Sequence, residues 1–141
     1  MKPHDPQFEQ RIYASFGQQQ VMATIGASLI LVEVGKVQIK LPYAVSLTQQ
    51  DGFLHAGIVT TIVDSACGYA AYTLMSPDAR VLTIEFKTNF IAPARGEYFI
   101  ATGEVLRAGR TITVCRGDVV AYHADGEKQI ALMQATMMSL T

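Results

Sequence analysis

The sequence predicts an α+β fold in which one long, buried helix is covered by a curled antiparallel sheet. A nearly all-apolar segment from about Ala56 to Met75 is long enough for a helix, and its later turns are rich in alanine. A helix with so small a polar face is buried rather than laid on a surface. Strand-like segments precede and follow it, and those that follow are separated by short turns of the kind that join antiparallel neighbours.

The segment before this helix predicts a short N-terminal helix and two strands. Asp5 can cap the helix and Gly17 is expected to end it. Between them, apolar side chains recur every four residues, at Phe8, Ile12 and Phe16. Strands are expected over Met22–Val34 and Lys36–Pro42, with Gly35 at the turn between them.

Four further strands are expected after Pro77, where the long helix stops. In the first of them apolar and polar side chains alternate, as in a half-buried strand. The four segments are Leu82–Phe90, Glu97–Arg107, Arg110–His123 and Gln129–Leu140. With one long helix, this order favours a sheet that curls over the helix and hides its apolar surface.

The composition fits one globular domain over residues 1–141. Only 16% of the residues are charged, where a small soluble domain usually has about 25%, so some surface is expected to lie against another chain. A net charge of −1 leaves no basic field for nucleic acid. No signal peptide or membrane-spanning run is recognisable, so a cytoplasmic location is expected, with Cys67 and Cys115 as reduced core residues.

Asp64 is the one formally charged residue between Gly52 and Pro77. Taking a carboxylate out of water raises its pKa and weakens the fold unless a partner offsets the cost. An acid retained in such a place is therefore a candidate for chemistry. The alternative is a structural aspartate that bonds a backbone amide or a hydroxyl such as Thr60 or Thr61.

The start of the long helix is a second candidate, because its first N–H groups have no partner within the helix. Ala56 and Gly57 are small and leave these groups open to the oxygen of a reacting carbonyl. His55 and Asp64 are nine residues apart, so along one helix they lie about 13 Å apart on opposite sides. Two antiparallel copies of the helix related by a two-fold axis would bring Asp64 of one copy to the helix start of the other. The site is then expected only in a dimer.

These residues resemble the phenylacetic-acid-degradation-type (PaaI-like) hotdog thioesterases. The family pattern is Asn-x-x-Gly-x-x-His-Gly-Gly with an Asp or Glu further along the helix, and this chain has Gln49, Gly52, His55, Ala56 and Gly57 at these positions, followed by Asp64. The segment from Leu82 to Gly96 is similar to the family's third strand and its Pro-x-x-x-Gly ending. Gln49 and Ala56 depart from the usual Asn and Gly. The longer Gln49 side chain puts the reach of its amide in doubt, whereas Ala56 keeps its N–H.

The resemblance implies a hotdog fold, with a helix wrapped by a six-stranded antiparallel sheet, in a homodimer or homotetramer that hydrolyses acyl-CoA or acyl-carrier thioesters without metal or other cofactor. It implies that Asp64 is the nucleophile or the general base and that the amide of Ala56, with that of Gly57, polarises the carbonyl. His55 orients the substrate or the helix start, while Thr83 and Gln49 lie beside the attacking water. Cations for the phosphates of CoA are expected among strand-end arginines, namely Arg95, Arg107 and Arg110.

Two alternatives to thioester hydrolysis stay open at this point. A hotdog protein that binds acyl-CoA without cleaving it is favoured by the replacement at Gln49. A hotdog hydratase of enoyl thioesters would pair a histidine with an acid, and His55 and Asp64 supply these residue types. The sequence leaves the acyl group undecided between an aromatic ring and an aliphatic chain.

Overall fold

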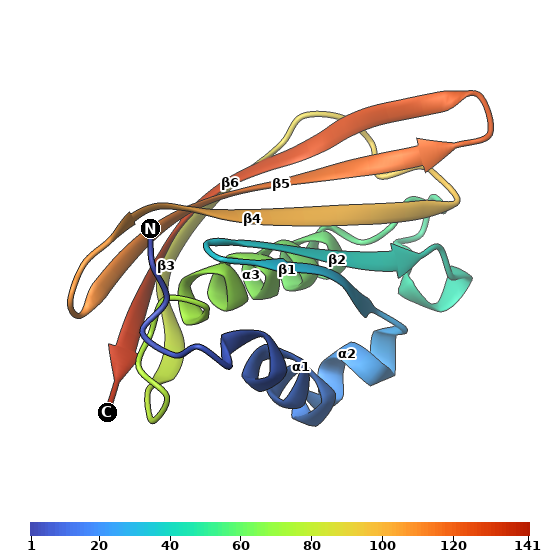
Figure 1. Cartoon of the computed structure of the whole chain (residues 1–141). Coiled ribbons are helices and arrows are strands. Elements are labelled where there is room, and N and C mark those ends of the chain that lie inside the picture. Colours follow the sequence, from blue (N-terminus) through green and yellow to red (C-terminus); the bar gives the residue numbers. More distant parts are fainter.

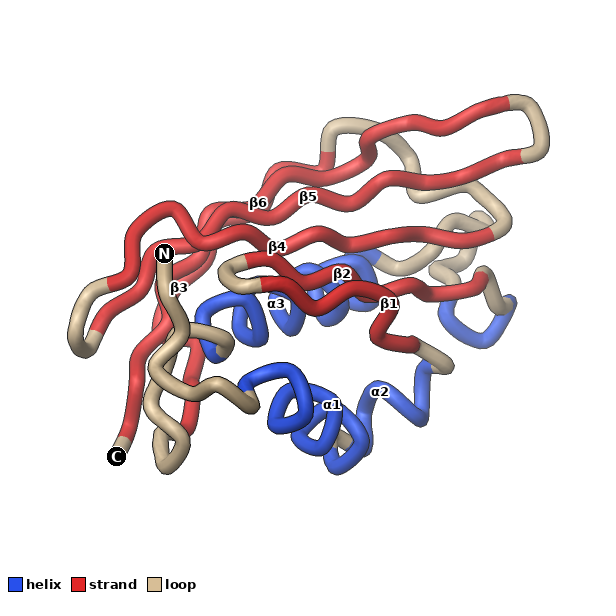
Figure 2. Tube along the Cα trace, viewed as in Figure 1, coloured by secondary structure: helices blue, strands red, loops and turns tan.

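The computed structural model describes all 141 residues, and its elements follow the predicted order closely. The helices and strands are α1 (Phe8–Gln18), α2 (Gln20–Ile25), β1 (Ser28–Glu33), β2 (Lys36–Pro42), the 3₁₀ helix η1 (Val45–Leu47), α3 (Ala56–Tyr72), β3 (Arg80–Phe90), β4 (Tyr98–Ala108), β5 (Ile112–His123) and β6 (Gly126–Leu140). The predicted hotdog arrangement is confirmed, with the sheet curled over α3 (Figures 1 and 2).

The six strands form one antiparallel sheet in the order β1-β2-β4-β5-β6-β3. β1 and β3 are the edge strands, and β3 pairs only with β6 although it directly follows α3 in the chain. Alternation decides which side of each strand faces the helix: Val37, Ile39 and Leu41 of β2 are fully buried. The concave face of the sheet and the apolar face of α3 form most of a core of 30 buried residues, which also includes residues of α1 and α2.

Two glycines allow α3 to lie directly on the middle of the sheet. A Cβ atom at Gly103 of β4 would meet the backbone of Ala66, and one at Gly117 of β5 would meet the side chains of Val63 and Cys67. Close contact at these points fixes the height and the rotation of α3 above the strands. The direction in which Asp64 leaves the helix is therefore set by the packing of Val63, Ala66 and Cys67 on the sheet.

The N-terminal segment departs from the prediction. Residues 22–25 are not part of a strand but belong to α2, which ends at Gly26 in the left-handed conformation (φ 82°). The local apolar pattern was ambiguous, and the outcome follows from packing, because Met22 and Ile25 lie three residues apart on one helical face and are both buried. The prediction that Gly17 ends the first helix is also wrong, since α1 continues to Gln18.

Helices α1 and α2 lie on the side of α3 away from β4, β5 and β6 (Figure 1). The Arg11 guanidinium of α1 donates hydrogen bonds to the carbonyl oxygens of Tyr72, Met75 and Ser76 at the C-terminal end of α3. Asp5 does not cap α1, because the N-cap of this helix is Gln7. The Asp5 carboxylate instead accepts hydrogen bonds from the backbone amide of Gln7 and from the Arg11 guanidinium. This arrangement holds α1 against α3 and makes it one wall of a cavity beside Asp64.

The predicted long helix and later strands are present with small shifts at their ends. α3 ends at Tyr72 rather than Met75, and β6 begins at Gly126 rather than Gln129, because the β5–β6 hairpin stays paired up to its turn. Both cysteines are free and buried, as predicted. None of the helices is long and apolar enough to cross a membrane.

Candidate active site

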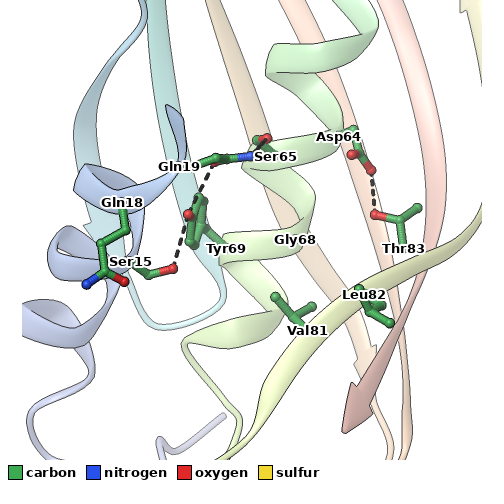
Figure 3. A pocket seen from close by; sticks show the side chains of 10 residues that line it. All are labelled: Ser15, Gln18, Gln19, Asp64, Ser65, Gly68, Tyr69, Val81, Leu82 and Thr83. Atoms are coloured by element: carbon green, nitrogen blue, oxygen red, sulfur yellow. Dashed lines mark hydrogen bonds between the residues drawn. The ribbon is translucent and has the colours of Figure 1, made fainter. Parts of the chain in front are cut away.

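Asp64 lies halfway along α3 and turns towards β3, where it meets Thr83 (Figure 3). The Thr83 hydroxyl donates a hydrogen bond of 2.7 Å to Oδ1 of Asp64. The other carboxylate oxygen, Oδ2, accepts no hydrogen bond from within the chain. A half-buried carboxylate with one oxygen held and one oxygen free is well placed to act on a bound molecule.

Burial raises the pKa of Asp64 above its ordinary value, and the hydrogen bond from Thr83 opposes that shift. The hydroxyls of Thr60 and Thr61, named above as structural partners, do not reach the carboxylate. They donate instead to the carbonyl oxygens of Ala56 and Gly57 within the helix. The only hydrogen-bond partner of Asp64 within the chain is therefore the Thr83 hydroxyl of β3.

The start of α3 is held in place by its own loop and by a second one. The amide of Leu54 donates to the carbonyl of Ala94, and the amide of His55 donates to the carbonyl of Leu47. Ala94 belongs to the segment from Pro93 to Gly96 that follows β3, so this hydrogen bond brings two distant parts of the sequence motif together. These two hydrogen bonds thus fix the position of the first free N–H of the helix, that of Ala56.

His55 is the N-cap of α3, and its Nδ1 accepts a hydrogen bond of 2.8 Å from the Gly57 amide. This bond requires that Nδ1 carries no proton, so the neutral ring has its N–H at Nε2. The Gly57 N–H is therefore occupied in this structure, and its donation to an oxyanion stays a prediction. The N–H of Ala56 has no acceptor within the chain and remains available.

Asp64 and the helix start do not share a pocket within one chain. Asp64 and Thr83 line a cavity of about 460 Å³. Ala56 and Gln49 line a separate, mainly apolar cavity of about 270 Å³ with Phe53, and no residue lines both cavities. The predicted separation of the acid from the oxyanion donor is in keeping with this division. Gln49 does lie beside Ala56, although its side-chain oxygen accepts from the amides of Asp51 and Phe53 in its own turn.

The three candidate arginines lie at two ends of the molecule. Arg95 is near the start of α3, where it lines a small cavity with His123 and Lys128 and lies over the Phe53 ring. That cavity shares Pro93 with the apolar cavity beside Ala56.

Arg107 and Arg110 lie at the other end of the β4–β5 hairpin, and Arg110 lines a cavity that also includes Leu74, just beyond the C-terminal end of α3. β4 spans 11 residues, so about 35 Å of strand separates them from the end near Arg95. The structure brings only Arg95 to the helix start.

Some residues of the two cavities were not recognised from the sequence. His123 and Lys128 come to Arg95 only through the β5–β6 hairpin. A chain of polar side chains beside Asp64 comes from α1, from α3 and from the residue between α1 and α2. The charged residue Lys128 near the end of the β5–β6 hairpin is the one sequence signal that could indicate the group around Arg95. No group of three or more His, Cys, Asp or Glu side chains is arranged to hold a metal ion.

Comparisons with known proteins identify the family of this chain. A family model of the thioesterase superfamily matches residues 51–125, more than half of the chain. A thioesterase family protein from Silicibacter pomeroyi is 50% identical and superposes with a TM-score of 0.93 over 94% of this chain and 98% of that one.

The medium/long-chain acyl-CoA thioesterase YigI of Escherichia coli is 32% identical over 98 residues, which are 60% of this chain and 61% of YigI. The E. coli PaaI protein from the phenylacetic acid degradation operon has a TM-score of 0.84 over 96% of this chain and 94% of its own; at 16% identity it shows a shared fold alone. The family match, together with the 50% identity across nearly the whole chain, shows that this protein belongs to the thioesterase superfamily.

Proposed function

We propose that the protein hydrolyses acyl-CoA thioesters at a site shared by two copies of the chain. Asp64 of one copy acts on the thioester carbonyl, and the Ala56 N–H at the α3 start of the other copy stabilises the oxyanion. The observation that carries the proposal is the separation of two complementary half-sites along one helix. An acid with a free oxygen lies halfway along α3, a free N–H lies at its start, and the two line different cavities.

The chemistry requires only these two groups and water. As a general base, Asp64 takes a proton from a water molecule while the water oxygen bonds to the carbonyl carbon. The oxyanion formed accepts a hydrogen bond from the Ala56 N–H. Its collapse breaks the C–S bond, and the departing thiolate takes the proton that Asp64 removed from water, which gives CoA as a thiol. As a nucleophile, the carboxylate would bond to the carbonyl carbon itself and the C–S bond would break, which releases CoA as a thiolate that is then protonated. Water would cleave the resulting anhydride in a second step to the free acid and the Asp64 carboxylate.

The exposed surface of β3 supports a second copy as the occupant of this edge. Large apolar side chains are between 43% and 54% exposed there, namely Leu82, Ile84, Phe86, Phe90 and the following Ile91. An exposed apolar patch of this kind marks an interaction surface, and an open strand edge also offers unpaired backbone groups. A two-fold contact at β3 lies next to Thr83 and hence next to Asp64. Whether two such dimers associate further into the expected homotetramer stays a prediction.

Two cationic side chains beside the helix start, Arg95 and Lys128, suit the phosphates of CoA. Arg95, His123 and Lys128 surround one cavity, and the apolar cavity that shares Pro93 with it leads to Ala56. The pantetheine arm of CoA is long and mostly apolar or amide-like, so the apolar cavity offers it a path from the phosphates to the thioester. For Arg107 and Arg110, a role in CoA binding stays a prediction that one chain alone does not support.

The shared site can be tested by complementation between two inactive variants. Asp64→Asn removes the acid and keeps an oxygen for Thr83. Ala56→Pro removes the N–H; proline is well tolerated at the first position of a helix, and His55 already has the extended conformation (ψ 138°) that a residue before proline requires. Ala56→Ser keeps the N–H and is the matched control. Each of the first two variants alone should lose activity by orders of magnitude in an assay of free CoA release.

Refolding the two variants together gives the discriminating result. With random assembly about half of the dimers are mixed, and each mixed dimer has one complete site, so about a quarter of the wild-type activity should return. No recovery from demonstrably mixed dimers would contradict a shared site. Full activity in Asp64→Asn would remove the acid from the mechanism. Binding of acyl-CoA by the unmodified protein without release of CoA would favour the alternative of a non-catalytic binding protein. The side-chain oxygen of Gln49 is occupied by the amides of Asp51 and Phe53, which is the reason to test this alternative.

A further inference from the structure

The cavity beside Asp64 has an unusual lining for a site that acts on fatty acyl groups. Ten residues line its volume of about 460 Å³, and only three of them are hydrophobic. Its walls come from the junction of α1 and α2, from one face of α3 and from β3 (Figure 3). Gly68, one turn beyond Asp64, leaves the floor without a side chain, so the cavity is open from the carboxylate to the far wall.

That far wall is a chain of hydrogen-bonded polar side chains (Figure 3). The Tyr69 hydroxyl donates to Oε1 of Gln19 at 3.2 Å, and Nε2 of Gln19 donates to the Ser65 hydroxyl at 3.2 Å. Ser15 is 3.2 Å from the Tyr69 hydroxyl and completes the chain. Gln19 therefore joins two residues of α3 from its position between α1 and α2.

The chain has hydrogen-bonding capacity that the protein does not use. The second N–H of the Gln19 amide and the hydroxyl hydrogen of Ser65 have no acceptor within the chain, and Oε1 of Gln19 can accept a second hydrogen bond. Gln18, which lines the same cavity, makes no side-chain hydrogen bond. Burial raises the pKa of Tyr69, so its hydroxyl keeps its proton and the direction of the chain is retained.

We propose that the acyl group of the substrate carries a hydroxyl or another hydrogen-bonding function, which the wall formed by Gln19, Tyr69 and Ser65 recognises. This inference rests on the proposed thioesterase function and names its substrate class. An unsubstituted acyl chain in this cavity would displace water from polar groups and give them no partner in return, whereas a hydroxylated one replaces the water. A site with buried polar groups discriminates against an analogue that lacks the matching group more strongly than an apolar pocket does.

The test compares matched substrates that differ only in one hydroxyl group. Suitable pairs are hexanoyl-CoA with ω-hydroxyhexanoyl-CoA, and benzoyl-CoA with meta-hydroxybenzoyl-CoA. In at least one pair the hydroxylated member should have a kcat/KM roughly 10-fold or more above its partner, since one hydrogen bond to a buried polar group is worth about that factor. Equal or better turnover of the unsubstituted member in both pairs would overturn the proposal.

Variants then locate the preference. Gln19→Leu should bring the ratio of kcat/KM values close to one, and Tyr69→Phe, which removes only the hydroxyl, should reduce it while retaining the ring contacts with Phe16 and Tyr72. Gln20→Leu is the matched control, since Gln20 is exposed and does not line the cavity. A preference that survives in both Gln19→Leu and Tyr69→Phe would also overturn the assignment.

Binding measurements separate this inference from the proposed function. Thioether analogues of the same acyl-CoA pairs cannot be hydrolysed, and calorimetry gives their affinities for the unmodified protein. Tighter binding of the hydroxylated analogue without turnover of any thioester would retain the inference and refute hydrolysis. Turnover of both members of each pair at equal kcat/KM would retain hydrolysis and refute the inference.

Discussion

Removing the hydroxyl of Thr83 tests whether the raised pKa of Asp64 controls the reaction. Thr83→Val keeps the shape of the side chain and deletes the donor of the 2.7 Å hydrogen bond to Oδ1. That bond stabilises the ionised form of Asp64, so its loss raises the pKa of the carboxyl still further. Because only the ionised form can take a proton or attack a carbon, the rate falls as the pH drops through this pKa. The acid limb of the kcat profile should therefore move to higher pH in the variant.

The size of the effect follows from the type of bond and its exposure. A hydrogen bond to a charged group contributes about 1.5–3 kcal/mol when it is well shielded. Thr83 is exposed, and water competes for the carboxylate, so the value should lie below this range, at about 1 kcal/mol. On the acid side of the limb, this lowers the rate about fivefold relative to the plateau of the same variant.

The assay is the pH dependence of kcat for one thioester, measured by CoA release and scaled to the alkaline plateau of each protein. A change in the plateau itself would support the proposed placing of water by Thr83, while the position of the limb reports on the pKa of Asp64. Thr88→Val is the matched control, because Thr88 lies on the same strand and its buried hydroxyl has no hydrogen-bond partner. A limb that stays in place or moves to lower pH in Thr83→Val would refute the reasoning.

Three further predictions concern stability and assembly. Gly103→Ala should lower the free energy of unfolding by about 1–3 kcal/mol in urea titrations, because the added Cβ would meet helix backbone that cannot rotate away. Gly17→Ala, on the open surface of α1, is the control and should stabilise the protein slightly. Asp64→Asn should raise the melting temperature at neutral pH, because burial raises the folded-state pKa of Asp64. The stability that comes with the protonated carboxyl is present below its unfolded-state pKa and is lost as the pH rises through its folded-state pKa. The gain should vanish at a pH below about 3.9, and a gain that persists there would point to another cause. Ile84→Glu should dissociate the dimer in light-scattering measurements. Ile30→Glu lies at a comparable irregularity of the opposite edge strand, β1, and should leave the dimer intact. Dissociation by both variants would contradict a dimer contact specific to the β3 edge.

The parts of the fold that the sequence predicts well are those with a strong local pattern. β2 has the predicted bounds because its apolar residues alternate without interruption, and α3 begins at the predicted Ala56 after its cap. Residues 22–25 lack such a pattern, and their helix depends on contacts with the distant core. Tertiary packing outweighs local preference in short segments of this kind.

The candidate site divides in the same way. Asp64 and the helix start can be recognised from the sequence, because an acid in an apolar helix and a small-residue helix start are both local features. The occupation of the Gly57 N–H by His55 depends on a side-chain rotation that no spacing reveals. The polar wall of Gln19, Tyr69 and Ser65 depends on how α1 and α2 lie against α3, and the wrongly predicted strand at Met22 would have placed Gln19 elsewhere.

The proposed division of the site between two chains would also account for the cost of a buried acid. In a single chain, Asp64 has one hydrogen bond and one free oxygen in a half-buried position, which weakens the fold at neutral pH. If the partner brings the positive end of its α3 to this carboxylate, the helix dipole offsets part of that cost only when the dimer has formed. Assembly and chemistry would then depend on the same contact. The Asp64→Asn variant should consequently gain less stability in the dimer than in a monomeric Ile84→Glu background, and an equal gain in both would show that the partner helix does not reach the acid.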